Sequence, residues 1–313
     1  MSAPSGDILI DLSTALLRSH DGLLQCRLVD ETQGGLSRLP SGPFMPHSHR
    51  TMETGLRQWV SEQVGVSLAH VEQLYTFADQ GRYRQTEDGH IVSVGYLALS
   101  RGPHEATEDS SSWGDLYDYF PWEDWRDGRP ALLDAVLLPA LDGWLKENAG
   151  QTDRVRLAFG RDGAQWDEEF VLERYELLYQ AGLVDEAVHD GRLAEPALAQ
   201  KLGTALQLDH RRILATAMGR LRGKLKYRPV IFDLMPPRFT LRALQATTEL
   251  VMGVNLHKQN FRRLVEKSGF LEATGDMERA RGRPAEIFRF RHSETGERPL
   301  AGLRVSAGRS RGV

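Results

Sequence analysis

A group of basic and amide side chains lies between residues 257 and 268, where the apolar residues recur at helical spacing. Gln259, Arg262 and Glu266 are three and four residues apart, so they share one face of a helix. Arg263 lies beside them. In the major groove of DNA an arginine can pair with guanine, and a glutamine or asparagine can pair with adenine. The spacing therefore predicts a helix whose outer face reads base edges.

Three more arginines follow this face in a short basic turn. Arg279, Arg281 and Arg283 alternate within the segment MERARGRPAE. Arginines in such a turn can reach phosphate groups or enter a narrow minor groove, and Arg281 to Pro284 is similar to a short minor-groove hook. The residues expected to contact DNA are Thr240, Arg242, Lys258, Gln259, Asn260, Arg262, Arg263, Arg279, Arg281 and Arg283.

These residues need a rigid support, and the sequence around them predicts one. Thr240 suits the N-cap of a helix that ends at Gly253, and a second helix is expected over 257–268. Strands that begin at Phe270 and cover 287–291 flank the basic turn. Two helices joined by a short turn and followed by a hairpin form a winged helix-turn-helix, whose second helix enters the major groove. Contacts with protein or RNA are the alternative use of such a domain.

The charge of the chain is divided between its two ends. Residues 1–200 carry 16 Lys and Arg against 33 Asp and Glu, a balance of −17. Residues 201–313 carry 23 against 10, a balance of +13. A basic C-terminal third is typical of a nucleic-acid module, although a solvated basic face has the same composition. The opposite balances also predict that the two halves are independent modules.

The first 160 residues mix the two kinds of hydrophobic periodicity, so they predict an α/β domain. An aromatic group that includes Trp113, Tyr117 and Trp125 follows a polar stretch. The elements expected here are a hairpin around Asp21-Gly22, a helix over 51–64, strands over 71–77 and 90–100, a helix over 131–146 and a short strand over 155–159.

From Asp167 onward the apolar period is helical. One helix is expected to stop at Gly182, and two more are expected over Ala194–Leu208 and Arg211–Leu225. A strand-like run over 229–235 leads into the C-terminal domain. This helical region is either a linker with a dimer interface or an extension of the core, and it must carry any message between the two halves.

Composition excludes several classes of protein. Cys26 is the only cysteine, so a disulfide framework within the chain and a cysteine-rich zinc site are both excluded. No apolar run approaches the ~20 residues needed to cross a bilayer, and the start MSAPSGDILIDLS lacks the basic segment of a secretory signal. We therefore expect a cytoplasmic protein.

Three pairs of segments carry a resemblance to a known family. They are VEQLYTFADQGRY with GHIVSVGYLALS, DLYDYFPWEDWRDGRPALLD with ERYELLYQAGLV, and FTLRALQATTELVMGVNLHKQNFRRLVEKSGFLEATG with RGRPAEIFRF. The first pair is similar to the central strands, and the third to the winged helix, of the Nudix-related transcriptional regulators of NAD metabolism. The second pair resembles the version found in repressors of de novo NAD synthesis. The resemblance covers residues 7–292.

This resemblance implies an α+β architecture in four parts. A Nudix-like α/β/α sandwich that senses a nucleotide covers 1–160, and a helical linker and dimerisation region covers 161–228. A winged-helix DNA-binding domain covers 229–300, followed by a flexible tail over 301–313.

The catalytic signature of the Nudix enzymes is degraded. Active members use a box of the form Gly-x5-Glu-x7-Arg-Glu-U-x-Glu-Glu-x-Gly-U, where U is aliphatic and the carboxylates hold magnesium against a diphosphate. Anchoring the pattern at Gly65-Val66 leaves Glu62 as one metal carboxylate and puts Gln63 at the next. Because one carboxylate cannot replace three, we expect no metal site and no catalytic residue, with Glu62 as a structural or solvated remnant.

The rest of the box departs from the pattern as well. Gln58-Trp59 replaces the Arg-Glu pair, and Gly42 matches the opening glycine only with a spacing two residues too long. Glu53 does not fit the register. The resemblance thus implies a lost hydrolase that keeps its pocket for recognition.

The retained pocket is expected to bind an anionic adenine nucleotide, which the resemblance implies to be NAD, ADP-ribose or ATP. Arginines can pair with its phosphates through two hydrogen bonds at once, and aromatic rings can stack on its base. Each of these side chains has a plainer use, as a surface ion pair or a core ring. The candidates for effector binding are Arg27, Arg38, Arg82, Tyr83, Tyr119, Phe120 and Trp122.

Together these observations predict a homodimeric repressor of NAD biosynthesis genes that binds operator DNA and responds to a nucleotide. Ligand binding would change the spacing of two recognition helices, which must match half-sites ~34 Å apart. One rival is a bifunctional protein that also hydrolyses ADP-ribose or NAD. Another is a Nudix-like protein whose winged helix contacts protein or RNA.

Overall fold

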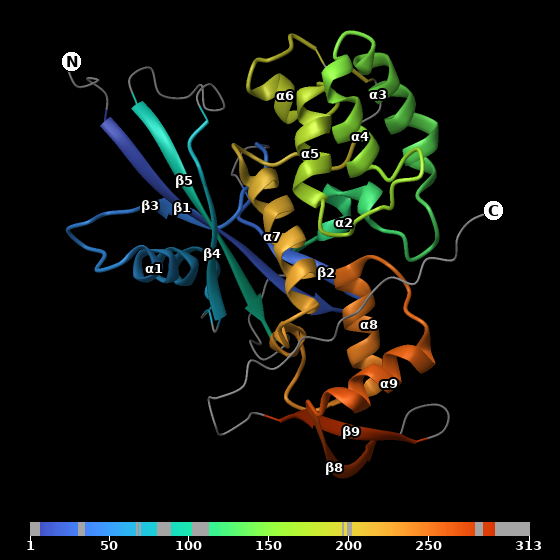
Figure 1. Ribbon diagram of the computed structural model, residues 1–313. Helices are drawn as coiled ribbons and strands as arrows, with labels where there is room; N and C mark the ends of the chain where they lie inside the picture. Colours follow the sequence, from blue (N-terminus) through green and yellow to red (C-terminus); the bar gives the residue numbers. More distant parts are fainter. Residues whose placement is uncertain are drawn as a thin grey trace.

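The computed structural model describes residues 7–30, 35–66, 68, 70–79, 89–101, 113–195, 197–198, 202–278 and 284–291. A twisted sheet with the N-terminal helix, a group of central helices and a C-terminal domain of helices and short strands follow one another along the chain (Figure 1). Five candidate residues, Arg82, Tyr83, Arg279, Arg281 and Arg283, lie outside the described residues.

The N-terminal sheet has the strand order β4-β5-β1-β2-β6, and β3 pairs with β1 beside this path. Its strands are β1 (Asp7–His20), β2 (Leu23–Arg27), β3 (Ser41–Pro43), β4 (His70–Phe77), β5 (Gly89–Ser100) and β6 (Trp113–Asp115). β1 and β5 are parallel and the other pairs are antiparallel. The predicted hairpin at Asp21-Gly22 is confirmed: both residues have positive φ, as a tight two-residue turn requires.

Helices cover both faces of this sheet (Figure 1). Val94 and Tyr96 of β5 pack against Leu56 of α1 (Met52–Val64), whereas a Cβ added at Gly95 would lie 3.1 Å from Ile213 of α7 (His210–Leu225). Neighbouring residues of a strand point to opposite faces, so α1 and α7 form two separate layers. The expected α/β/α sandwich is confirmed, and α7, from the region predicted as linker, supplies its second helical layer.

The central part of the chain is helical. It contains α2 (Leu116–Tyr119), the 3-10 turn η2 (Pro121–Glu123), the π-helical turn η3 (Leu133–Leu137), α3 (Leu138–Leu145), the 3-10 turn η4 (Ala149–Gln151), α4 (Thr152–Ala158), α5 (Val171–Gln180) and α6 (Glu186–His189). The predicted helix over 131–146 is confirmed as η3 continuing into α3.

Two sequence predictions in this part are wrong. The strand expected over 155–159 is the end of α4: Val155, Ala158 and Phe159 are buried while Leu157 is exposed, which is helical and not alternating spacing. The helix expected over Ala194–Leu208 does not form in the residues described there. Gly203 and Leu208 both have positive φ, which a right-handed helix does not allow.

The C-terminal domain is a winged helix. It consists of η5 (Val230–Leu234), β7 (Phe239–Thr240), α8 (Leu241–Met252), α9 (Lys258–Ser268), β8 (Leu271–Glu278) and β9 (Ala285–Phe290), with the strand order β7-β9-β8. The Thr240 hydroxyl accepts a hydrogen bond from the amide of Ala243 at 3.2 Å, which confirms the predicted N-cap. Gly253 and Gly269 end the two helices with positive φ, also as predicted.

The run over 229–235 was predicted as a strand, and this is wrong. It forms the 3-10 turn η5, in which Ile231, Phe232 and Leu234 are buried. Pro229 precedes this turn and two further prolines follow it, and proline cannot donate to a strand ladder. A short apolar run bounded by prolines therefore fits a compact turn better than a paired strand.

Candidate nucleic-acid interface and sensor site

The outer face of α9 presents the predicted base-reading residues to solvent. Phe261 and Val265 are buried against the domain, whereas Lys258, Gln259, Asn260, Arg262 and Arg263 are exposed. Arg262 donates to Glu266 one turn along at 2.7 Å, an exposed contact that solvent weakens and a stronger anion can replace. The predicted amphipathic division of this helix is confirmed.

The two candidate residues at the start of α8 differ in their exposure to solvent. Arg242 is exposed. The Thr240 side chain is instead buried and engaged as the N-cap of α8. The Thr240 side chain therefore sets the start of α8, and its hydroxyl already has a protein partner.

Two arginines that the sequence analysis did not single out lie near the wing. Arg238 pairs with Asp276 of β8, and Arg289 of β9 donates to Glu272 at 2.8 Å. Both arginines are more than half exposed. Their signal in the sequence is position: Arg238 directly precedes the N-cap strand, and Arg289 alternates with the half-buried Phe288 and Phe290.

The residues that the sequence aligns with a Nudix box make structural contacts. The Gln63 side chain donates to the carbonyl of Ser41 at 2.7 Å and accepts from its amide at 3.1 Å, which ties α1 to β3. The Trp59 indole covers Gly42, where an added Cβ would lie 2.5 Å from the ring. Glu62 is exposed and accepts from Gln58 at 2.8 Å. Within the described residues, no group of three His, Cys, Asp or Glu side chains could hold a metal ion.

Two predicted effector residues converge on the C-terminal end of α1. Arg27 Nη2 lies 3.4 Å from the carbonyl of Val64, and Arg38 Nη1 lies 3.4 Å from Gln63 Oε1 and 3.1 Å from Ser41 Oγ. The Arg27 guanidinium also lies 5.3 Å from the ring centre of Trp113. Two cations therefore flank one helix end, a position that the helix dipole favours.

The three described aromatic candidates for effector binding build the core instead. Tyr119 is 5% exposed, and Phe120 and Trp122 are fully buried. Phe120 and Trp122 pack edge to face with ring centres 6.0 Å apart. A base cannot stack on rings that have no exposed face, so their burial contradicts the expectation that they bind the nucleotide.

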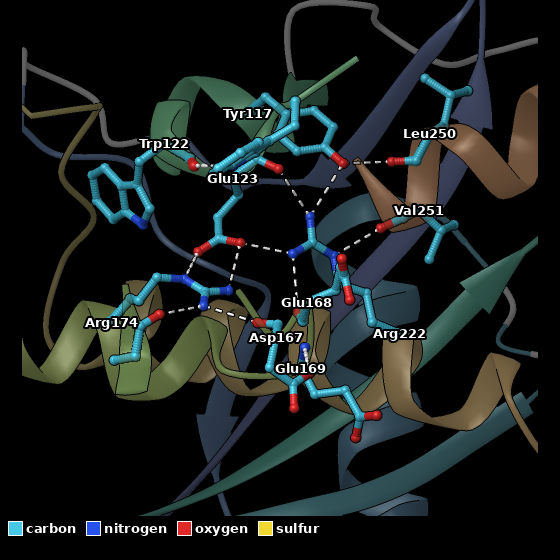
Figure 2. A network of polar contacts seen from close by, with 12 residues as sticks. Tyr117, Trp122, Glu123, Asp167, Glu168, Glu169, Arg174, Arg222, Leu250 and Val251 are labelled. Atoms are coloured by element: carbon cyan, nitrogen blue, oxygen red, sulfur yellow. Dashed lines mark hydrogen bonds and ion pairs between the residues drawn. The ribbon is translucent and has the colours of Figure 1, made fainter. Parts of the chain in front are cut away.

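A buried ion network joins the central helices, and sequence analysis missed it (Figure 2). Arg174 of α5 donates to both carboxylate oxygens of Glu123 at 2.5 and 2.9 Å, and Arg222 of α7 donates to the same carboxylate at 2.7 Å. All three side chains are fully buried. Burial alone would raise the pKa of Glu123, but the two guanidinium groups lower it below its usual value.

The same network reaches the winged helix. Tyr117 donates to the carbonyl of Leu250 at 2.6 Å, and Arg222 Nε donates to the carbonyl of Val251 at 2.9 Å (Figure 2). The amide of Trp125 donates to Gly253 at 2.7 Å. The prediction of independent modules is therefore wrong, because buried hydrogen bonds join the two parts.

His210 fastens the first residue of α7 to the sheet domain. The amide of Leu39 donates to its Nδ1 at 3.0 Å, and Ser13 Oγ lies 3.4 Å from its Nε2. Burial, helped by Arg38, lowers the pKa of His210 to about 3. The ring is therefore neutral at physiological pH, and this neutral form can accept the Leu39 hydrogen bond.

A groove of about 570 Å³ lies where the end of α7, η5 and the wing strands meet. Four basic side chains line it, and three of them, Arg101, Lys224 and Arg289, already form ion pairs with acidic neighbours. Its floor is formed mainly by buried apolar residues of the winged helix. The groove therefore carries little uncompensated charge.

None of the helices within the described residues has the length and the apolar character that crossing a membrane requires.

Comparison with known proteins agrees with this architecture. Residues 231–290 match the family model of the NrtR DNA-binding winged helix domain. The ADPR responsive transcriptional repressor NtrR of Acinetobacter baylyi is 42% identical over 93 residues, which are 30% of this chain and 37% of that relative. The match thus spans little more than a third of the relative's length.

Two solved structures extend the likeness to the whole chain. Shewanella oneidensis NrtR complexed with a 27mer DNA has a TM-score of 0.57 and 20% identity, over 90% of this chain and 93% of that one. Shewanella oneidensis NrtR in a second crystal structure has a TM-score of 0.53 at the same identity, over 90% and 94%. The chain therefore has the fold of these regulators, a Nudix-like domain followed by a winged helix of the NrtR type.

Proposed function

We propose that this Nudix-related chain, with its NrtR-type winged helix, is a transcriptional repressor that binds operator DNA and responds to an adenine nucleotide. The observation that carries the proposal is the exposed basic and amide face of α9, within a domain that matches a DNA-binding family. Genes of NAD biosynthesis are the proposed targets, because the sequence resembles the repressors of that pathway. The protein would act in the cytoplasm, as a homodimer on two half-sites.

ADP-ribose is the first effector to test, since the Acinetobacter baylyi relative is named for its response to it. Arg27 and Arg38 are the proposed phosphate partners, because both guanidinium groups reach the C-terminal end of α1. A diphosphate could accept hydrogen bonds from the half-buried Arg38 directly, and from Arg27, which is 6% exposed, once the ligand draws its guanidinium outward. NAD and ATP share the adenosine and the diphosphate, so they are the matched alternatives.

We further propose that the sensor binds its nucleotide without hydrolysing it. Gln63 occupies a position where active enzymes keep a metal carboxylate, and both ends of its amide are engaged by Ser41. Glu62 is exposed and accepts a hydrogen bond from Gln58 at 2.8 Å. A single carboxylate cannot supply the several negative oxygen ligands that magnesium needs to bind a diphosphate.

The test is a binding experiment with full-length protein and DNA. Operator sequences are first selected from random duplexes, and their affinity is compared with an unrelated duplex of equal length by fluorescence anisotropy. Specific binding is expected to be about 10³-fold or more tighter. Equal affinity for both duplexes would reject operator recognition, and sedimentation of the protein–DNA complex would show whether two copies bind one site.

The same assay tests the sensor. Saturating ADP-ribose, NAD or ATP is added in turn, and operator affinity is measured again. Coupling is reciprocal, so the nucleotide that changes operator affinity must have its own affinity changed by operator by the same factor, typically about 5- to 150-fold. Operator affinity that none of the three nucleotides changes would reject the sensor proposal.

A further inference from the structure

The C-terminal end of α8 is held by residues from outside the winged helix. The last carbonyls of a helix have no partner within the helix and are usually satisfied by a glycine turn or by water. Here the carbonyls of Leu250, Val251 and Gly253 accept from Tyr117 Oη, Arg222 Nε and the amide of Trp125. The winged helix thus depends on the other part of the protein to complete its first long helix.

This contact is closely packed as well as hydrogen-bonded. Gly253 has φ +67°, and a Cβ added to it would lie 2.4 Å from the carbonyl oxygen of Glu123 and 2.9 Å from Tyr117 Oη. An arginine beside helix carbonyls also complements the negative end of the helix dipole. A change in the position of residues 117–125 must therefore either move α8 or break these contacts.

α8 passes its position on to the recognition helix. Glu249 accepts a hydrogen bond from the amide of Leu256 at 2.8 Å, and Gln245 donates to the carbonyl of Leu256 at 3.0 Å. Leu256 lies in the turn that leads into α9. Phe261 and Val265 of α9 belong to the same buried core as α8. The two helices therefore move as a unit.

In the other direction, the contact leads directly to the proposed effector residues. Arg27 of β2 is paired with Trp113 of β6 in the sheet, and the guanidinium groups of Arg18 and Arg27 lie 3.8 and 5.3 Å from the centre of the Trp113 ring. Asp115, at the end of β6, accepts from the amide of Tyr117 at 3.2 Å and caps α2. Only the end of β6 and the first turn of α2 thus separate Trp113, which contacts Arg27, from the Tyr117 hydroxyl that holds α8.

We propose that the segment 113–125 is the output element of the sensor, and that Tyr117 and Arg222 are positioning residues that set the orientation of α8 and α9. The inference rests on the proposed function and names its regulation. A nucleotide phosphate that draws the Arg27 guanidinium away from Trp113 shifts β6, and the shift reaches α8 through Tyr117. The ligand changes DNA binding because it favours one of two positions of this segment.

Tyr117→Phe in the full-length protein tests the inference, because it keeps the ring and removes only the hydroxyl. Operator affinity is measured with and without saturating ADP-ribose, NAD or ATP, and nucleotide affinity is measured separately without DNA. The ratio between the operator affinities measured without and with nucleotide is expected to fall about fivefold or more, toward one, the value for no coupling. Nucleotide affinity in the absence of DNA is expected to change less than about twofold, since the hydroxyl does not touch the proposed phosphate partners.

The matched control is Tyr75→Phe on β4, whose ring is largely exposed and which is expected to keep the wild-type ratio. If Tyr117→Phe keeps the wild-type ratio of operator affinities with and without nucleotide, segment 113–125 is not the output element, and the proposed function is unaffected. A wild-type protein that responds to no nucleotide would instead remove the proposed function, and the inference with it.

A second measurement needs no variant. Hydrogen exchange of the wild-type protein is followed with and without the nucleotide that changes operator affinity. Amides of residues 113–125 and of the last turn of α8 are expected to change their protection together. A change confined to the sheet domain would also overturn the inference.

Discussion

Gln259 is the residue at which base reading can be separated from phosphate contact. It is exposed on the outer face of α9, and an amide can pair with adenine through two hydrogen bonds. Gln259→Ala is expected to cost roughly 1–3 kcal/mol on operator DNA and little on an unrelated duplex. Fluorescence anisotropy on both duplexes measures the difference, with the exposed Lys267→Ala in the last turn as the control. Equal losses on both duplexes would assign Gln259 to phosphates, and no loss would reject its role.

His210 gives the folded protein a predictable dependence on pH. Burial lowers its pKa from 6.5 to about 3, so the unfolded chain takes up this proton at a higher pH than the folded chain. Its stabilising contribution is complete above pH 6.5 and is lost progressively as pH falls toward 3. At about pH 5 this loss is roughly 2 kcal/mol.

Urea unfolding near neutrality and at about pH 5 measures this effect. His210→Asn keeps an acceptor for the Leu39 amide but cannot be protonated, so its stability is expected to change less with pH. The exposed His90→Asn serves as the control. The same pH dependence in wild type and His210→Asn would contradict the assignment.

At the scale of elements, the side chains of α1 determine whether the sensor could hold a catalytic metal ion. Gln63 ties the helix to β3, and Glu62 is the one carboxylate that the proposed alignment leaves at a metal position. We therefore expect no turnover of ADP-ribose or NAD with magnesium or manganese, measured as release of AMP by chromatography. A steady rate that Glu62→Gln abolishes, and that Glu53→Gln leaves unchanged, would contradict this expectation.

The sequence predicted the elements whose ends are marked by capping residues. It did not predict the elements whose conformation depends on how they pack in the fold. Thr240, Gly253 and Gly269 mark helix ends through caps that act on the nearest backbone groups, and all three are confirmed. The run 155–159 is short enough to fit either a strand or a helix, and only its burial pattern in the fold distinguishes them. The broken segment after Ala194 depends on positive φ at Gly203 and Leu208, which composition does not reveal.

The arrangement of the whole molecule was the least predictable, because it depends on buried charges. Arg222 follows Met218 and precedes Leu225 on the apolar face of α7, where periodicity alone suggests a long side chain at the rim of the core. Its full burial depends on Glu123, which lies 99 positions away in the sequence. Similarly, Arg27 and Arg38 were expected to bind phosphate, but only the fold shows that both reach the end of α1.

Glu123→Gln tests whether this network makes one cooperative unit of the protein. The carboxylate compensates two buried guanidinium groups, so its loss leaves positive charge without a counter-charge in the core. We expect the free energy of unfolding to fall by about 3–5 kcal/mol, whereas the exposed Glu62→Gln changes it by less than about 0.5 kcal/mol. Because α8 is held by the same network, tryptophan fluorescence and far-UV circular dichroism of the wild type are expected to report one coincident transition in urea. Two separated transitions, with Glu123→Gln affecting only one of them, would instead show that the winged helix is an independent module.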